Sequence, residues 1–114
     1  MNIEEIKGLV VDALEDGKGI DIKVLNVREK TSVTDILVIA GGTSTRQIKA
    51  LADRVVERVK ENGMQPLGVE GQSNSGWILV DLGDVVIHLM LAETRDFYNL
   101  EKLWGDDAPD APKG

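Results

Sequence analysis

The sequence has 114 residues, the size of one ordinary domain, and 42% of them are hydrophobic, which is enough for a conventional core. It contains no cysteine, which excludes disulfides, thiolate metal sites and a cysteine nucleophile and fits a reducing compartment. The formal net charge of −7 makes nucleic acid a poor primary ligand and favours a basic partner, although a need for solubility would explain the charge equally well.

The N-terminus does not resemble a targeting signal. Residues 1–5 are acidic and lack the basic and apolar regions of a signal peptide. No apolar run approaches the roughly 18 residues that span a bilayer. We therefore expect a cytoplasmic protein.

The first 40 residues predict a helix followed by two strands. Apolar residues recur at helical spacing over residues 2–16, and Gly17 is a suitable stop. Residues 20–27 alternate near period two, which predicts a half-buried strand. The continuous aliphatic run of residues 36–40 predicts a strand that is covered on both faces.

A second helix and a short strand follow. Ser44 and Gln47 fit a capping box that opens the helix, and Gly63 ends it. Residues 67–70 predict a short strand, and the glycine- and serine-rich residues 71–76 predict a flexible loop.

The last third of the chain predicts a β-hairpin and a terminal helix. The strands cover residues 77–82 and 85–91, and the two-residue turn of Gly83 and Asp84 joins them with glycine first. Residues 93–104 predict a short helix.

These elements predict a single domain. We expect it to cover residues 1–105 and to be followed by a disordered acidic tail over residues 106–114, which is rich in Asp, Ala and Pro. The order α-β-β-α-β-β-β-α indicates the α/β (α+β) class, with a mixed β-sheet and helices packed on it.

The hairpin separates two kinds of side chain. Three aliphatic cross-strand pairs point to one side, which must be the core: Leu82 with Val85, Val80 with Ile87, and Ile78 with Leu89. The other side carries Trp77, Leu79, Asp81, Val86, His88 and Met90. This mixture suits a protein interface, where Trp and Met are common. A second core layer beneath a helix suits it slightly better on this pattern alone, because three helices could cover both faces.

The aromatic residues favour the interface. All of them lie in the last third of the chain, at Trp77, Phe97, Tyr98 and Trp104. Aromatic residues dominate binding hot spots, although they are also ordinary core material. Their clustering indicates that this region differs from the rest of the molecule.

Familiar catalytic and metal-binding patterns are missing from the sequence. One histidine and no cysteine exclude a typical structural zinc site, and no G-x-S-x-G elbow accompanies His88. Residues 41–44 could hold a phosphate before a helix, but without a Walker A or dinucleotide motif a plain capping turn is the better interpretation. Asp81 and Asp84 fall on opposite faces of an ideal strand, which argues against a metal pair. We therefore expect no catalytic residue, no metal and no cofactor.

Several segments resemble the Iojap family, whose bacterial members are ribosomal silencing factors. The matching segments are residues 21–27, 34–40, 42–47, 69–71, 77–88 and 93–104. The strings W-x-L-x-D-x-G-D-x-V-x-H and R-x-F-Y-x-L-E-x-L-W within the last two are long and specific. The chain departs from the family at Asn26, at residues 16–19, and at Ile36 and Leu82, where the family usually has aspartate, a lysine-rich turn and tyrosines.

The resemblance implies a fold related to nucleotidyltransferases without their catalytic residues. It also implies a translational repressor that binds the fourteenth protein of the large ribosomal subunit and sterically blocks joining of the small subunit, with only peripheral nucleic-acid contact. Such a protein is not an enzyme, and the family suggests a homodimer when it is free. A large-subunit assembly factor is the first alternative, and a nucleotidyltransferase-like enzyme is the second.

The resemblance and the mixed side of the hairpin, which adds Met90, together imply the site residues. The partner-binding set that we expect is Glu70, Trp77, Asp81, His88, Met90, Tyr98, Glu101 and Trp104. In this set Trp77 and Met90 are apolar anchors, and the carboxylates pair with lysine or arginine of the partner. Arg95 does not suit a basic partner, so we expect it to hold an internal carboxylate such as Asp84. Phe97, Leu100 and Leu103 are expected to attach the last helix to the sheet.

Overall fold

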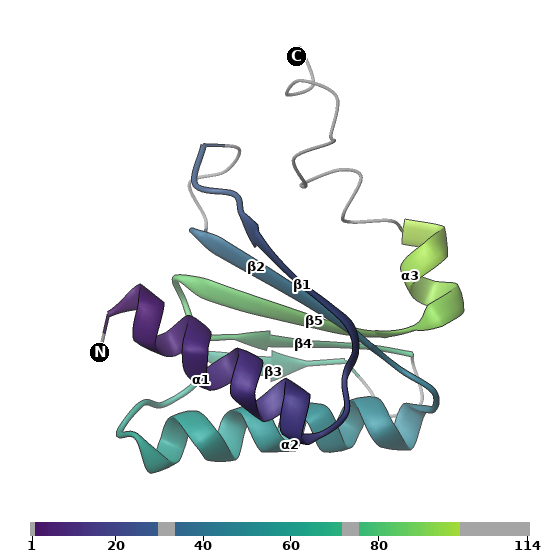
Figure 1. Ribbon diagram of the computed structural model, residues 1–114, viewed down its shortest axis with the longest axis horizontal. Helices are drawn as coiled ribbons and strands as arrows, with labels where there is room; N and C mark the ends of the chain where they lie inside the picture. Colours follow the sequence, from purple (N-terminus) through teal and green to yellow (C-terminus); the bar gives the residue numbers. More distant parts are fainter. Residues whose placement is uncertain (1, 30–33, 72–75, 99–114) are drawn as a thin grey trace.

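The structure, a computed structural model, describes residues 2–29, 34–71 and 76–98. Its elements are α1 (Ile3–Asp16), β1 (Ile20–Asn26), β2 (Ile36–Gly42), α2 (Thr45–Glu61), β3 (Gly68–Glu70), β4 (Trp77–Asp81), β5 (Val85–Leu91) and α3 (Ala92–Tyr98). This is the predicted order α-β-β-α-β-β-β-α, and the α+β class is confirmed (Figure 1). The predicted tail at residues 106–114 and the end of the last helix lie outside the described residues, so the domain limits stay a prediction.

The strands form one mixed sheet in the order β1-β2-β5-β4-β3. The central pair, β2 and β5, is parallel, and the other neighbours are antiparallel. The hairpin has the predicted register, with Ile78 opposite Leu89 and Val80 opposite Ile87. Gly83 opens its turn at φ +91°, a conformation that favours glycine.

Both long helices cover the same face of the sheet (Figure 1). Their apolar stripes meet the strand residues of that face in a core whose fully buried members include Val10, Leu14, Val38, Ile48, Leu51, Val55, Val80, Ile87 and Leu89. Burial of each such aliphatic side chain contributes roughly 1.5–3 kcal/mol, so this layer dominates the stability of the fold. The described part of the chain contains no helix that is long and apolar enough to cross a bilayer.

The junction between the two helices depends on Gly17. This residue is the C-cap of α1, as predicted, and a Cβ atom there would lie 2.6 Å from Leu51 Cδ2 of α2. Lys18 then takes the left-handed conformation at φ +63°, and the N–H of Gly19 donates to the carbonyl of Leu14 at 2.7 Å. Glycine at position 17 therefore allows the end of α1 to pack directly on α2.

The capping box of α2 forms in part. The N–H of Gln47 donates to Ser44 Oγ at 3.1 Å, as predicted. The Gln47 side chain, however, accepts from the N–H of Thr43 at 2.7 Å, one residue before the N-cap. Its Nε2 donates to the carbonyl of Lys18 at 3.2 Å. Gln47 thus connects the turn after β2 to the turn after α1.

β1 differs from the regular half-buried strand that alternation predicts. Its register against β2 shifts between Ile20 and Lys23, and Asp21 has φ +50°. The shift interrupts the period-two pattern, and Ile20 and Val24 are left 45% and 39% exposed. The strand lies at an edge of the sheet, which explains why its burial is low.

Candidate functional site

The candidate site is the sheet face opposite the two long helices, which we call the mixed face. We define it by residues of β2 to β5 that point to that side: Leu37 and Ile39 of β2, Glu70 of β3, Trp77, Leu79 and Asp81 of β4, and Val86, His88 and Met90 of β5. The described helices α1 and α2 do not pack on it, because all their buried residues belong to the core on the other side.

Strand register arranges these side chains in rows across the sheet. In one row Ile39, His88, Leu79 and Glu70 are successive cross-strand neighbours on β2, β5, β4 and β3. A second row contains Leu37, Val86 and Asp81, and a third contains Gly41, Met90 and Trp77. Directly opposed residues share a face, so sequence positions from four strands meet in one surface.

The β2 side of the mixed face is buried. Leu37, Ile39, Met90 and Val27 form a small apolar cluster, and Met90 and Ile39 have no exposed surface. The expectation that Met90 is an anchor for a partner therefore needs correction, because its side chain lies beneath the surface and supports it. A second core layer does exist, but it occupies only this part of the face.

Toward β4 the mixed face is partly exposed. Trp77 and Val86 pack against the small cluster and remain half-buried, as do Leu79, Asp81 and His88. Glu70 is exposed at the edge of the sheet, and its cross-strand neighbour is Leu79. An apolar centre with an indole is thus bordered by two carboxylates on the β3 and β4 side.

Trp77 and His88 form a hydrogen-bonded pair within this area. The indole Nε1 donates to His88 Nδ1 at 2.9 Å, and the ring centroids lie 5.6 Å apart with the planes tilted by 48°. Burial lowers the pKa of His88 from 6.5 to about 4. His88 is therefore neutral at neutral pH, and Nδ1 is an acceptor.

Asp81 contributes to the hairpin turn as well as to the mixed face. Its Oδ1 accepts from the N–H of Gly83 at 2.8 Å, a local contact that is common for aspartate before a turn. Asp81 is half-buried, and this hydrogen bond within the turn fixes the position of its carboxylate. Among the residues that the structure describes, no group of three His, Asp or Glu side chains could hold a metal ion.

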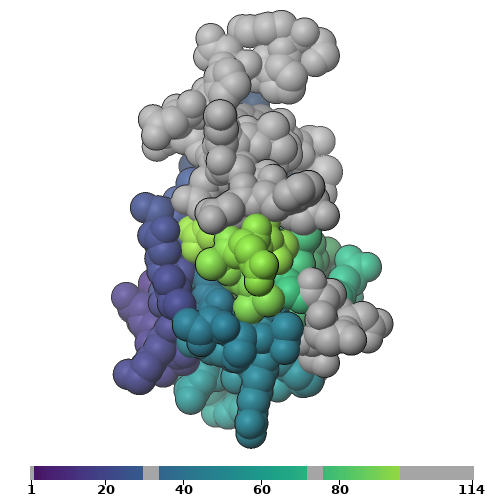
Figure 2. Space-filling model, turned by 90° about the vertical axis from the view of Figure 1, so that its right-hand side faces the viewer, coloured from purple at the N-terminus to yellow at the C-terminus, as the bar shows by residue number. Residues whose placement is uncertain are grey.

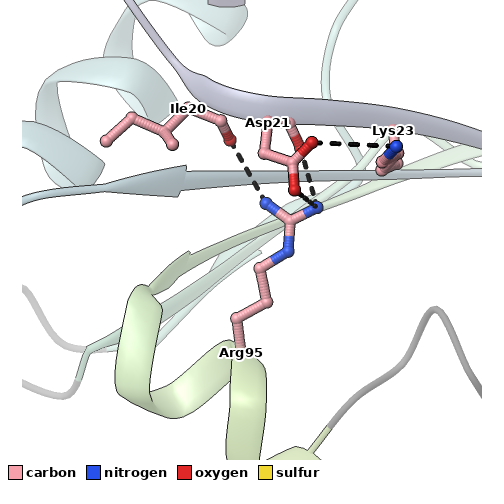
Figure 3. Close-up of polar contacts among 4 residues, drawn as sticks. All are labelled: Ile20, Asp21, Lys23 and Arg95. Atoms are coloured by element: carbon pink, nitrogen blue, oxygen red, sulfur yellow. Dashed lines mark hydrogen bonds and ion pairs between the residues drawn. The ribbon is translucent and has the colours of Figure 1, made fainter.

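Arg95 of α3 contacts β1, where it pairs with an internal carboxylate as expected, but the carboxylate is that of Asp21 and not that of Asp84. Its Nη1 donates to the carbonyl of Ile20 at 3.2 Å and its Nη2 to the carbonyl of Asp21 at 2.7 Å (Figure 3). Nη2 also lies 3.8 Å from Asp21 Oδ2, and Asp21 Oδ1 lies 3.7 Å from Lys23 Nζ. Asp84 precedes β5 whereas Arg95 follows it, so about 20 Å of strand separates them.

Gly41 makes room for this contact. A Cβ atom at Gly41 would lie 3.6 Å from Arg95 Nη1 and 3.5 Å from the carbonyl oxygen of Ile20, which places the guanidinium over β2 on its way to β1. Figure 2 views this end of the molecule and shows α3 in green between the blue β1 and the blue-teal segment that leads into α2. A glycine within an aliphatic strand often marks such a close approach, which is the signal that sequence reasoning missed.

The remaining predicted site residues lie at the end of α3 or outside the described residues. Tyr98 ends α3, but its side chain is outside what the structure describes, as is that of Phe97. Glu101 and Trp104, with Leu100 and Leu103, lie outside the described residues. Of the predicted set, the structure therefore brings together Glu70, Trp77, Asp81 and His88 on one partly exposed area, beside a buried Met90.

Comparison with known proteins identifies close relatives. The family model described as "Ribosomal silencing factor during starvation" matches residues 1–113. A ribosomal silencing factor of Chromobacterium violaceum is 47% identical over 109 residues, which cover 96% of this chain and 89% of that protein. A ribosomal silencing factor of Bacillus subtilis is 40% identical over 106 residues, covering 93% and 90%.

Solved structures and a mitochondrial relative extend this comparison. A crystal structure from Chromobacterium violaceum superposes with a TM-score of 0.89 at 46% identity, covering 100% of this chain and 95% of that one. A crystal structure from Bacillus halodurans has a TM-score of 0.79 at 36% identity, with coverages of 89% and 94%. A mouse protein named mitochondrial assembly of ribosomal large subunit protein 1 is 39% identical over 84% of this chain and 43% of that protein.

Proposed function

Because the chain belongs to the ribosomal silencing factor family, we propose that it binds the fourteenth protein of the large ribosomal subunit and blocks joining of the small subunit. Membership makes it a ribosome-associated regulator or assembly protein. Its mechanism is steric, so it needs no catalytic group, and its place of action is the cytoplasm.

The observation that carries the proposal is the half-exposed Trp77 within a sheet face that the two long helices leave uncovered. Tryptophan is the residue most enriched in binding hot spots, and it contributes most where neighbouring residues exclude water. Leu79 and Val86 are such apolar neighbours. The area thus has the composition of an interface centre.

Charge supports a basic partner. The chain has a net charge of −7, and Glu70 and Asp81 lie on the same sheet face as the indole, on β3 and β4. Ribosomal proteins carry many lysines and arginines because they neutralise RNA phosphates. Complementary charge would steer such a partner to this face and fix its register.

A subunit-joining assay tests the proposal. Purified small and large bacterial subunits are mixed with and without the protein, and the fraction of whole ribosomes is measured by sedimentation. We expect the wild-type chain to reduce that fraction, and Trp77→Ala to weaken binding to large subunits by about 2–4 kcal/mol while the fold is retained.

The matched control is Leu67→Ala, because Leu67 is 73% exposed and precedes the edge strand β3. This variant should block joining as well as the wild-type chain does. Unimpaired joining in the presence of excess wild-type protein would contradict the proposal, and normal affinity of Trp77→Ala would remove the indole from the contact.

An assembly role is the second candidate, and the name of the mouse relative favours it. Sucrose gradients of cell extract distinguish the two roles. A silencing factor sediments with mature free large subunits, whereas an assembly factor sediments with precursors. A homodimer of the free chain, which the family suggests, would have to dissociate if its contact overlaps the mixed face.

A further inference from the structure

The hydrogen bond between Trp77 and His88 decides which nitrogen of the imidazole carries the proton. An indole N–H can only donate, so His88 Nδ1, at 2.9 Å from it, must be the acceptor. A neutral imidazole has one proton, which is then on Nε2. The indole therefore fixes the tautomer of its neighbour.

The proton on Nε2 has no acceptor in the described part of the chain. Within the described residues, the imidazole of His88 makes its hydrogen bond through Nδ1, which accepts from Trp77. Among the described residues no buried side-chain nitrogen or oxygen lacks a partner, so Nε2 keeps accessible surface. Strand pairing to Ile39 and Leu79 holds the backbone of His88 in the centre of the sheet.

We propose that His88 is a partner-binding hydrogen-bond donor, in which Trp77 fixes the tautomer and Nε2–H binds a carbonyl oxygen of the docked protein. This inference rests on the proposed function of the mixed face. A carbonyl is the fitting acceptor because Glu70 and Asp81 border the same area and would repel a carboxylate. The low pKa of His88 is consistent with a neutral donor.

The free chain tests the tautomer directly. His88 is the single histidine of the sequence, so the imidazole region of a ¹⁵N NMR spectrum reports on this ring alone. We expect protonated Nε2 and unprotonated Nδ1 in the wild-type chain at neutral pH, and a mixture of tautomers in Trp77→Phe. Protonated Nδ1 in the wild-type chain would overturn the proposal.

Two substitutions separate the two nitrogens in binding to purified large subunits. His88→Gln keeps an outer N–H near the position of Nε2 but loses the acceptor for Trp77, and His88→Asn keeps that acceptor but loses the outer donor. We expect His88→Asn to lose about 3- to 10-fold in affinity and His88→Gln to lose less. Thermal unfolding verifies that both variants fold.

The outcomes distinguish this inference from the proposed function. If the wild-type chain binds large subunits and His88→Asn binds equally well, the donor role is wrong and the proposed function stands. If His88→Gln is the weaker variant, His88 only positions the indole, and the donor role is again wrong. A wild-type chain that does not bind large subunits would overturn the proposed function and this inference with it.

Discussion

His88 gives the stability of the protein a pH dependence that can be isolated. In the folded chain its pKa is lowered to about 4 by burial, below the ordinary value of 6.5. As the pH falls below 6.5, His88 binds a proton in the unfolded chain but not in the folded chain. The free energy of unfolding therefore decreases. The decrease continues down to about pH 4, where the folded chain is protonated too.

Between pH 7 and pH 4 we therefore expect the free energy of unfolding to decrease on the order of 2–3 kcal/mol more in the wild-type chain than in His88→Gln. Urea unfolding of both proteins across this range measures the difference. The carboxylates of the same face, Glu70 and Asp81, are present in both proteins, so subtraction removes their contribution. Parallel pH profiles would show that the imidazole is not desolvated.

At the site, sequence predicts which face a side chain points to but not how deeply it is buried. The alternation of the hairpin placed Trp77, Asp81 and His88 on one face, and the strand register confirms that placement. The depth of each side chain was not predictable, because it depends on what packs above the sheet. Met90 has the same alternation as Trp77 but is fully buried.

Among the elements, α3 and β1 are joined by Arg95. Two of its nitrogens donate to the carbonyls of Ile20 and Asp21, where the register of β1 shifts. A guanidinium that is nearly buried and holds two backbone carbonyls fixes both its own helix and the irregular strand. We infer that α3 and β1 open together when this contact is lost.

Arg95→Met should lower the free energy of unfolding by about 1–3 kcal/mol and increase amide hydrogen exchange in both α3 and β1. Lys23→Met is the matched control, because the Lys23 side chain is 49% exposed and pairs with Asp21 at 3.7 Å. Such a surface pair contributes between zero and about 1 kcal/mol. Equal effects of the two substitutions, or faster exchange in α3 alone, would contradict this role of Arg95.

Helices and strands were predictable from sequence where the pattern that specifies them lies within a few neighbouring residues. Helical spacing, the cap at Ser44 and the turn at Gly83 act within a few residues, and each was confirmed. The partner of Arg95 was not predictable, because Ile20 and Asp21 precede it by more than 70 residues. Only the shift in β1 and the open space at Gly41 bring the guanidinium to those carbonyls.

The whole molecule is asymmetric. One face of the sheet is closed by two helices, while the other has a small buried cluster beside a half-exposed area with acidic neighbours. Sequence predicted the two kinds of face from the hairpin. The hairpin pattern alone slightly favoured a second core layer, and the clustered aromatic residues then favoured an interface. The structure divides the face instead, because the apolar cluster extends from β2 only as far as Trp77 and Val86.

The acidic charge should act mainly on the rate of association with large subunits. Glu70→Lys should slow association several-fold and weaken its dependence on salt, with little change in the dissociation rate, because a peripheral charge steers encounter. Asp53→Lys, on the outer side of α2, makes the same change of charge away from the mixed face. Stopped-flow measurements at several salt concentrations compare the association rates of the two variants. Equal rates and equal salt dependence would mean that net charge alone steers the chain.

Site-specific crosslinking tests most directly whether the mixed face is the docking surface. The chain has no cysteine, so Leu79→Cys and Asp53→Cys each give one attachment point for a short photo-crosslinker, on the mixed face and on the outer side of α2. With purified large subunits, we predict that position 79 crosslinks to the fourteenth protein and that position 53 does not. Crosslinks to that protein from position 53 alone, or from position 79 only to other ribosomal components, would contradict the account.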